Sequence, residues 1–94
     1  MALTAVIAYD VSEDRRRSHV AAVLQKYGDR IQFSVFLCRV EEDTLKQLTT
    51  TMRTIIDTAT DSIYVFRQCQ DCWSTVETIG QASPPEPTLY WAVL

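Results

Sequence analysis

The residues with the clearest potential for chemistry lie close together near the amino terminus. Asp10 follows Tyr9 at the end of an apolar run, and three consecutive arginines, Arg15, Arg16 and Arg17, come shortly afterwards. A carboxylate is a hard oxygen ligand of the kind that Mg²⁺ prefers, and guanidinium groups bind phosphate oxygens through two parallel hydrogen bonds. The segment therefore indicates an anion-binding site beside a metal-binding carboxylate. The alternative is a strand followed by a capped helix with a solvated face.

One carboxylate is a poor ligand set for Mg²⁺, because this ion takes near-octahedral oxygen ligands and usually retains several waters. In a two-fold symmetric dimer, however, each Asp10 would have a symmetry mate. Two carboxylates and a bound phosphate would form a hard-metal site suited to phosphodiester hydrolysis. We therefore consider Asp10 a metal ligand and catalytic residue in a site that two protomers form together. The alternative is a carboxylate that accepts backbone N–H groups at the start of the helix.

Helix geometry separates the three arginines. Arg15 lies on a flank away from the apolar stripe, whereas Arg16 and Arg17 project closer to that stripe at the start of the helix. We therefore expect Arg17 to lie near Asp10. The functional interpretation is phosphate contact by all three guanidinium groups, and the alternative is a solvated helix face with i,i+4 ion pairs.

Two aromatic residues are candidates for the same site. Tyr9 precedes Asp10, so its ring could reach the same strand end. Phe36 alternates with Ser34 on the less apolar face of its strand. Either ring could stack on a nucleobase, whereas packing in the core is the commoner role of such residues. The sequence leaves both roles open.

Five segments have patterns that would position these residues. Continuous apolar content predicts a buried strand over 2–9. Residues at helical spacing predict a helix capped by Ser12 and ended by Gly28. Residues 30–40 are strand-like with the odd-numbered apolar side chains on one face, and a bend at 32–34 would divide them into two strands. Further along, the pattern predicts a second helix beginning at 41–43 and a strand over 62–69.

The order of these segments predicts an α+β fold in which two helices cover one face of an antiparallel sheet. All three prolines lie in "QASPPEP", residues 81–87, which has the composition of an extended linker. We therefore divide the chain into a domain at 1–80 and a proline-rich linker with a terminal strand at 81–94. A strand on such a tether is suited to pair with the sheet edge of a second copy, so we expect a homodimer.

Composition limits the class of protein. With 94 residues, 47% of them hydrophobic and 22% charged, the chain has the size and content of one globular domain. The net charge is −3, but residues 1–40 carry six basic and four acidic side chains, whereas residues 41–94 carry three and eight. This asymmetry favours a local face for an anionic partner. There is no run of about 20 apolar residues and no signal-peptide pattern, so we expect a cytoplasmic protein without membrane contact.

With these residues in view, the sequence resembles CRISPR-associated protein 2, a family of small dimeric adaptation nucleases. The resemblance is carried by "YDVSEDRRRSHVAAVLQKYGDRIQFSVFLCRV" at 9–40. It continues through "LKQL" at 45–48, "DSIYVFRQCQDC" at 61–72 and "IG" at 79–80. It covers nearly the whole chain except the last dozen residues, and its combination of motifs is specific.

The resemblance implies a ferredoxin-like βαββαβ sandwich with an extra C-terminal strand, and a symmetric homodimer in which this strand joins the partner's sheet. Members are described as metal-dependent endonucleases on single-stranded RNA or double-stranded DNA. They are also described as the centre of the complex with the spacer integrase, CRISPR-associated protein 1. Asp10 is similar to the magnesium-binding aspartate at the dimer interface, and positions implicated in activity or nucleic-acid contact match Tyr9, Arg17, Arg30 and Phe36.

One departure from the family pattern concerns phosphate attraction. His19 stands where some members described as ribonucleases carry an arginine. A histidine is mostly neutral at pH 7, so its attraction for phosphate would be weaker and would depend on pH.

The resulting hypothesis is a CRISPR adaptation protein with endonuclease activity on RNA or DNA phosphodiesters, dependent on Mg²⁺ or alternatively Mn²⁺, that takes part in spacer acquisition. In it the catalytic residues are Asp10, Tyr9 and Arg17, and the residues that bind nucleic acid are Arg15, Arg16, Arg17, Arg30 and Phe36. The alternative is a non-catalytic dimeric scaffold for the integrase and prespacer DNA. A third hypothesis, a regulator or redox module using "CQDC" (Cys69 and Cys72), is less favoured, because the pair follows a predicted strand and does not open a helix that would lower a thiol pKa. A structural zinc site is disfavoured because no second Cys or His pair completes its four ligands.

Overall fold

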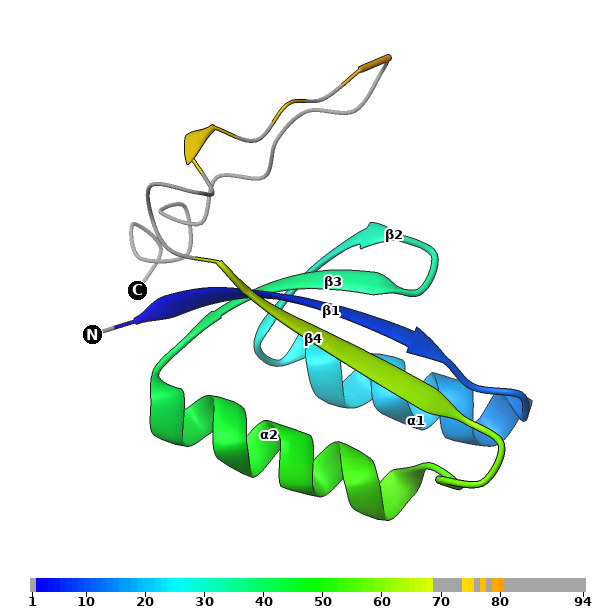
Figure 1. Ribbon diagram of the computed structural model, residues 1–94. Helices are drawn as coiled ribbons and strands as arrows, with labels where there is room; N and C mark the ends of the chain where they lie inside the picture. The colour runs from blue at the N-terminus through cyan, green and yellow to red at the C-terminus, as the bar shows by residue number, and fades with distance from the viewer. Residues whose placement is uncertain (1, 69–73, 76, 78, 81–94) are drawn as a thin grey trace.

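A computed structural model describes residues 2–68, 74–75, 77 and 79–80 of the chain. Its elements follow the order predicted above, strand, helix, two strands, helix and strand (Figure 1). They are β1 (Leu3–Asp10), α1 (Asp14–Gln25), β2 (Gly28–Gln32), β3 (Val35–Val40), α2 (Glu42–Ile55) and β4 (Ser62–Gln68). The predicted α+β class and βαββαβ order are therefore confirmed.

The strands form one antiparallel sheet in the order β2-β3-β1-β4, and both helices lie on the same side of it (Figure 1). β1 occupies the interior of the sheet, where it pairs with β3 from Leu3 to Ala8 and with β4 from Thr4 to Asp10. Strand β1 thus has neighbours on both sides. Its last residue, Asp10, pairs only with Ser62 of β4, at the end of the ladder.

The core lies between the sheet and the two helices. Side chains alternate across a strand, so Ala5, Ile7 and Tyr9 of β1 face the helices and are buried. The apolar stripes of the helices cover them, and the buried residues of those stripes are Val20, Ala21, Leu24, Leu45, Leu48 and Met52. Burial of these side chains from water is the main favourable term that holds the helices on the sheet.

The ends of α1 differ from the prediction. Glu13, rather than Ser12, is the N-cap, and its side chain accepts a hydrogen bond from the backbone N–H of Arg16 at 2.9 Å. The Ser12 side chain is directed toward Asp61 instead, because its N–H and hydroxyl both donate to that carboxylate. The helix ends at Gln25, and Gly28 begins β2 instead of terminating the helix.

The segment 30–40 is divided by a turn, as the predicted bend at 32–34 indicated, and the two parts pair as the hairpin β2–β3. An irregularity between Arg30 and Gln32 shifts the register in β2. Phe36 pairs with Ile7 and faces the helices, with no exposed surface. Its expected place on the less apolar face was therefore wrong, because Ser34 lies in the turn and Phe36, Cys38 and Val40 form the buried face of β3.

Several predicted features lie outside the described residues. These are the cysteine pair Cys69 and Cys72, the linker with its terminal strand at 81–94, and hence the proposed division of the chain at residue 80.

Cys38 is buried in β3, and burial raises the pKa of its thiol to about 12. No helix in the described part of the chain is long and apolar enough to cross a membrane.

A methyl group at Gly28 should destabilise the β2–β3 hairpin. A Cβ added there would meet the Leu37 carbonyl and come within 2.8 Å of the Cys38 Cα, and neither backbone atom can rotate away. We expect Gly28→Ala to lower the free energy of unfolding by about 1–3 kcal/mol in urea denaturation. Gln25→Ala, at an exposed helical position, is the control and should change it by less than about 0.5 kcal/mol. Equal stability of the two variants would contradict the close approach.

Candidate active site at the carboxyl end of β1

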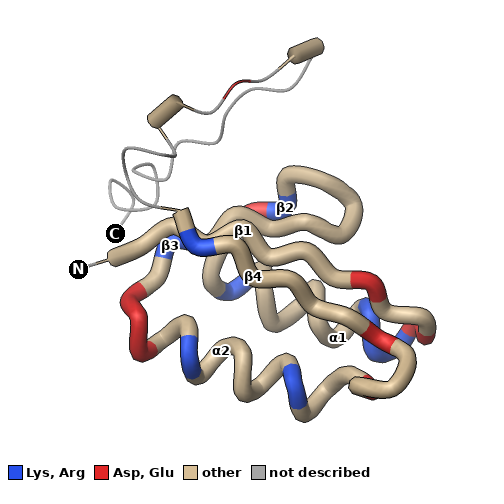
Figure 2. The backbone as a smooth tube through the Cα atoms, viewed as in Figure 1, with Lys and Arg blue, Asp and Glu red and all other residues tan. Residues whose placement is uncertain are grey.

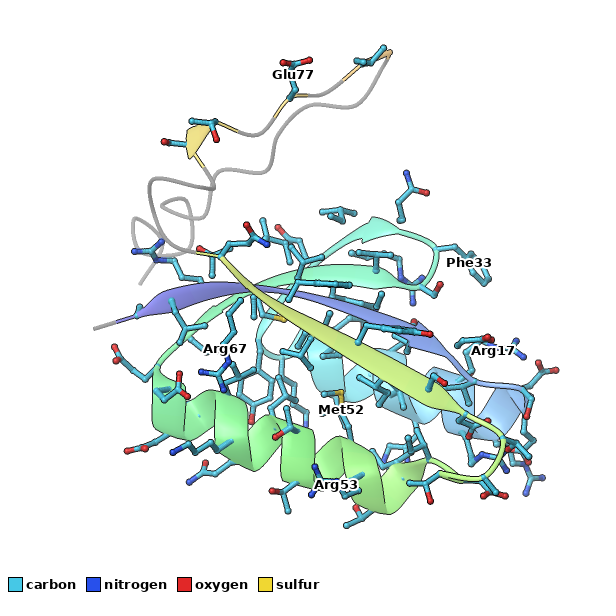
Figure 3. The ribbon with its side chains drawn as sticks, viewed as in Figure 1. Arg17, Phe33, Met52, Arg53, Arg67 and Glu77 are labelled. Atoms are coloured by element: carbon cyan, nitrogen blue, oxygen red, sulfur yellow. The ribbon has the colours of Figure 1, made fainter. Side chains whose placement is uncertain are left out.

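The end of β1 opens into a depression of about 370 Å³. The neighbouring β2–β3 hairpin forms part of it, because the backbone N–H of Tyr9 donates to the Ser34 carbonyl at 3.0 Å. Figure 3 shows Arg17 and Phe33 at this end of the molecule. The residues that line the depression are Tyr9, Asp10, Val11, Ser12, Arg17, Phe33 and Ser34.

Asp10 presents an exposed carboxylate on the sheet face opposite the helices, since Tyr9 before it is buried on the helix face. Among the described residues, no backbone or side-chain group donates a hydrogen bond to this carboxylate, so the alternative role as an acceptor of backbone N–H groups is not seen. Its oxygens are therefore available to a hard cation. The same part of the chain contains no group of three His, Cys, Asp or Glu side chains that could hold a metal ion. The described part of one protomer therefore holds no complete metal site around Asp10.

Arg17 lies at the same depression as Asp10, as helix geometry predicted. Its Nε donates to the Val11 carbonyl at 3.1 Å, and its Nη1 pairs with Asp14 at 2.7 Å. Asp14 is almost fully exposed, so this ion pair is weak and can exchange for another anion. The guanidinium is therefore oriented by the backbone while remaining partly accessible. Figure 2 shows the acidic end of β1 close to the basic start of α1.

Arg16 points toward the segment between α2 and β4. Its Nε donates to Asp61 Oδ2 at 2.8 Å, and its Nη2 lies 3.4 Å from Asp61 Oδ1. A guanidinium already paired with a carboxylate in this two-point manner has fewer donors for phosphate. The geometry thus favours the structural alternative for Arg16, whereas Arg15 is exposed on the flank where helix geometry placed it.

Asp61 is one of the residues near this site that the sequence analysis did not single out. Its buried side chain accepts hydrogen bonds from the N–H and hydroxyl of Ser12, the N–H of Asp57 and the hydroxyl of Thr60, in addition to Arg16. The Arg16 guanidinium and these donors hold the pKa of the Asp61 carboxyl well below its usual range. The only local signal was an aspartate directly before a predicted strand. Its main partner lies 45 residues away along the chain.

The two aromatic candidates pack in the core. Tyr9 and Phe36 are both buried, and their ring centroids lie 6.2 Å apart in a stacked arrangement. This burial favours the core-packing alternative over base stacking for both rings. Arg30 is exposed on β2, and its guanidinium carbon lies 5.2 Å from the Phe36 centroid and 6.0 Å from that of Phe33.

Comparisons with known proteins agree with this arrangement. The family model described as CRISPR associated protein Cas2 matches residues 2–76. A relative from Chloroflexus aurantiacus, CRISPR-associated endoribonuclease Cas2 1, is 38% identical over 82 residues, which cover 86% of this chain and 88% of the relative.

Two solved structures have the same fold. The crystal structure of Streptococcus pyogenes Cas2 at pH 6.5 has a TM-score of 0.73 and 33% identity, with 82% of this chain and 99% of that chain covered. A chain from a partial Cas6-RT-Cas1–Cas2 complex has a TM-score of 0.72 and 26% identity, with 87% of this chain and 94% of that chain covered.

Removal of the Asp61 charge should destabilise the fold in a pH-dependent manner. Because its pKa is lower in the folded state than in the unfolded state, its contribution is present above the unfolded pKa of about 4 and is lost as the pH falls through the folded pKa. We expect Asp61→Asn to lower Tm by about 10 °C at neutral pH, with a smaller difference from the parent at the lowest pH at which both fold.

Circular dichroism melts across a pH series would measure this difference. Asp43→Asn, which changes an exposed carboxylate on α2, is the control and should shift Tm by less than about 3 °C. A Tm difference for Asp61→Asn that stays constant with pH would contradict the assignment of the lowered pKa.

Proposed function

Because this chain belongs to the CRISPR associated protein Cas2 family, we propose that it acts in CRISPR adaptation as a homodimeric, metal-dependent endonuclease. The proposed substrates are RNA or DNA phosphodiesters, and the proposed metal is Mg²⁺ or Mn²⁺. The observation that carries this proposal is the exposed Asp10 carboxylate, which shares one depression with the partly accessible guanidinium of Arg17.

The sheet face that bears Asp10 supports the homodimer. Val6, Ala8 and Asp10 alternate along this face of β1, and Phe66 and Tyr64 of β4 pair with the first two. Tyr64 is 54% exposed and Phe66 is 51% exposed, and their rings stack with centroids 6.3 Å apart. Both helices lie on the other side of the sheet (Figure 1). An apolar surface of this kind is typical of a protein–protein interface.

Association of two copies through this face would double the site. A two-fold symmetric contact uses the same surface on both subunits, so each residue of the interface meets its counterpart or a neighbour of it. Asp10 ends the row of side chains on this surface, and a second copy would therefore bring a second Asp10 to the interface. Two carboxylates with waters and a substrate phosphate satisfy the preference of Mg²⁺ for oxygen ligands better than one.

The chemistry follows from this ligand set. A bound metal ion would polarise the phosphoryl group and lower the pKa of a coordinated water. In hydrolysis, a water oxygen forms a new bond to phosphorus, the bond to the leaving oxygen breaks, and that oxygen takes up a proton. Arg17 would bind a phosphate oxygen, since its Nε is oriented by the Val11 carbonyl and its pairing with exposed Asp14 is readily replaced.

The second candidate function is a non-catalytic dimeric scaffold for the integrase CRISPR-associated protein 1 and prespacer DNA. Two observations favour it. Each protomer contributes one carboxylate to the proposed metal site, and the fold matches a chain from a partial Cas6-RT-Cas1–Cas2 complex. In this function Arg17 and Arg30 would contact the DNA backbone without hydrolysis.

Asp10→Ala separates these two functions. If the carboxylate holds the metal, we expect cleavage of RNA and DNA oligonucleotides in Mg²⁺ to fall by at least about 100-fold, with the dimer intact. Spacer acquisition measured separately in cells would show whether cleavage is needed for it. Asp43→Ala is the control and should cleave normally. Unchanged cleavage by highly purified Asp10→Ala would contradict the metal-site proposal.

Phe66→Glu tests the proposed dimer surface. A charge placed on this apolar face would be buried on association, so we expect the dimer dissociation constant to rise by at least about 100-fold in sedimentation equilibrium. Thr51→Glu on the exposed side of α2 should leave it unchanged. Cleavage should be lost together with the dimer. A monomeric Phe66→Glu protein with full cleavage would show that the site does not need a second copy.

A further inference from the structure

Phe33 is an aromatic residue whose position no requirement of the fold explains. It lies at the tip of the β2–β3 hairpin, its side chain is 76% exposed, and it lines the same depression as Asp10 and Arg17 (Figure 3). A ring this exposed contributes little to the core. The ring is therefore better explained by contact with a ligand in the depression than by packing in the core.

We propose that Phe33 and Arg30 form a stacking platform for one unpaired nucleobase, and that this platform positions a single-stranded segment at Asp10. The proposal rests on the proposed nucleic-acid function of this site and adds a positioning residue to it. Base–aromatic stacking needs an accessible ring face, and every base offers one irrespective of its sequence.

The placement of Arg30 supports this role. Its guanidinium carbon lies 6.0 Å from the Phe33 centroid and 5.2 Å from that of buried Phe36, so it approaches one side of the exposed ring. A cation held near an aromatic ring is attracted by the ring and remains able to bind a phosphate oxygen. One nucleotide could thus stack its base on the Phe33 ring and bind the Arg30 guanidinium through its phosphate.

The surroundings of Phe33 favour a nucleotide over a second copy of the chain. Two cationic residues, Arg17 and Arg30, lie at the depression or against the ring. The exposed rings of Tyr64 and Phe66, in contrast, stack on each other on the apolar sheet face. A ring beside two cations has the chemistry of a polyanion site with one aromatic contact, whereas a protein–protein interface is depleted of charge at its centre.

The platform implies a preference among substrates. Bases in a duplex are stacked on their neighbours, so only a single strand, or a loop or frayed end, can place a base on Phe33 without the cost of unpairing. Phosphate contacts from Arg17 and Arg30 are available to paired and unpaired strands alike. Phe33 should therefore affect the binding of single strands far more than that of duplexes.

The test is oligonucleotide binding by Phe33→Leu, which keeps an apolar side chain and removes the ring. Fluorescence anisotropy would be measured in EDTA, where metal-dependent cleavage cannot occur. The probes are labelled oligouridylate, oligothymidylate, a blunt duplex of the same length, and a single strand whose bases are replaced by abasic sites. We expect the Kd for both single strands to rise about tenfold and that for the duplex and the abasic strand to change less than about twofold.

Two further variants exclude a general structural effect. Phe33→Trp should bind single strands at least as tightly as the parent protein, because it retains a ring. Tyr27→Leu removes an exposed aromatic side chain near the other end of α1 and should leave all four Kd values unchanged. The oligomeric state and Tm of Phe33→Leu should match those of the parent, as expected for a largely exposed side chain.

The outcomes separate this proposal from the nuclease proposal. Equal effects of Phe33→Leu on all four probes, no effect on any, a changed oligomeric state, or no binding of single strands by the parent protein would each overturn the platform. The expected binding pattern in a protein that does not cleave in Mg²⁺ would support the platform and contradict only the nuclease activity.

Discussion

The geometry of the candidate site depends on the hydrogen bonds and the ion pair made by the buried carboxylate of Asp61. A buried charge is costly unless it is paired and hydrogen-bonded, and here the Arg16 guanidinium and donors from Ser12, Asp57 and Thr60 satisfy it. These bonds join the segment after β1 to the segment before β4. They also direct Ser12 toward Asp61, while the following residue, Glu13, caps α1 and Arg17 lies against the Val11 carbonyl.

One face of the sheet forms the hydrophobic core with the helices, and the opposite face bears Asp10 of the candidate site. Side chains alternate along β1, so Tyr9 fills the core beside Phe36 while Asp10, one residue later, is exposed on the opposite face. The same alternation places Asp10 in a row with Val6 and Ala8 on the side away from the helices. Among the described residues, this carboxylate belongs to no group of three His, Cys, Asp or Glu side chains that could hold a metal ion, and the sheet face that it shares carries the exposed rings of Tyr64 and Phe66.

The three consecutive arginines do not act as one cationic patch. Arg16 is part of the Asp61 network, Arg17 is oriented at the depression, and Arg15 is exposed on the flank of α1. In a chain with a net charge of −3, this leaves Arg17 at the end of β1 and Arg30 on the adjoining hairpin as the guanidinium groups closest to Phe33 and the depression. Attraction of a polyanion depends on this local field and not on the net charge.

The sequence by itself determined the element order, the α+β class, the bend in the segment 30–40 and the closeness of Arg17 to the end of β1. These features depend on local periodicity and on residues a few positions apart, whose geometry a strand or helix dictates. Only the tertiary structure decided the face of Phe36, the partner of Arg16 and the neighbours of Phe33. The first depends on a turn that takes Ser34 out of the strand, the second on a carboxylate 45 residues away, and the third on a hairpin folded against the end of β1. Contacts between segments distant in sequence leave no periodic signal in the sequence. They therefore cannot be predicted from local patterns and are known only from the folded structure.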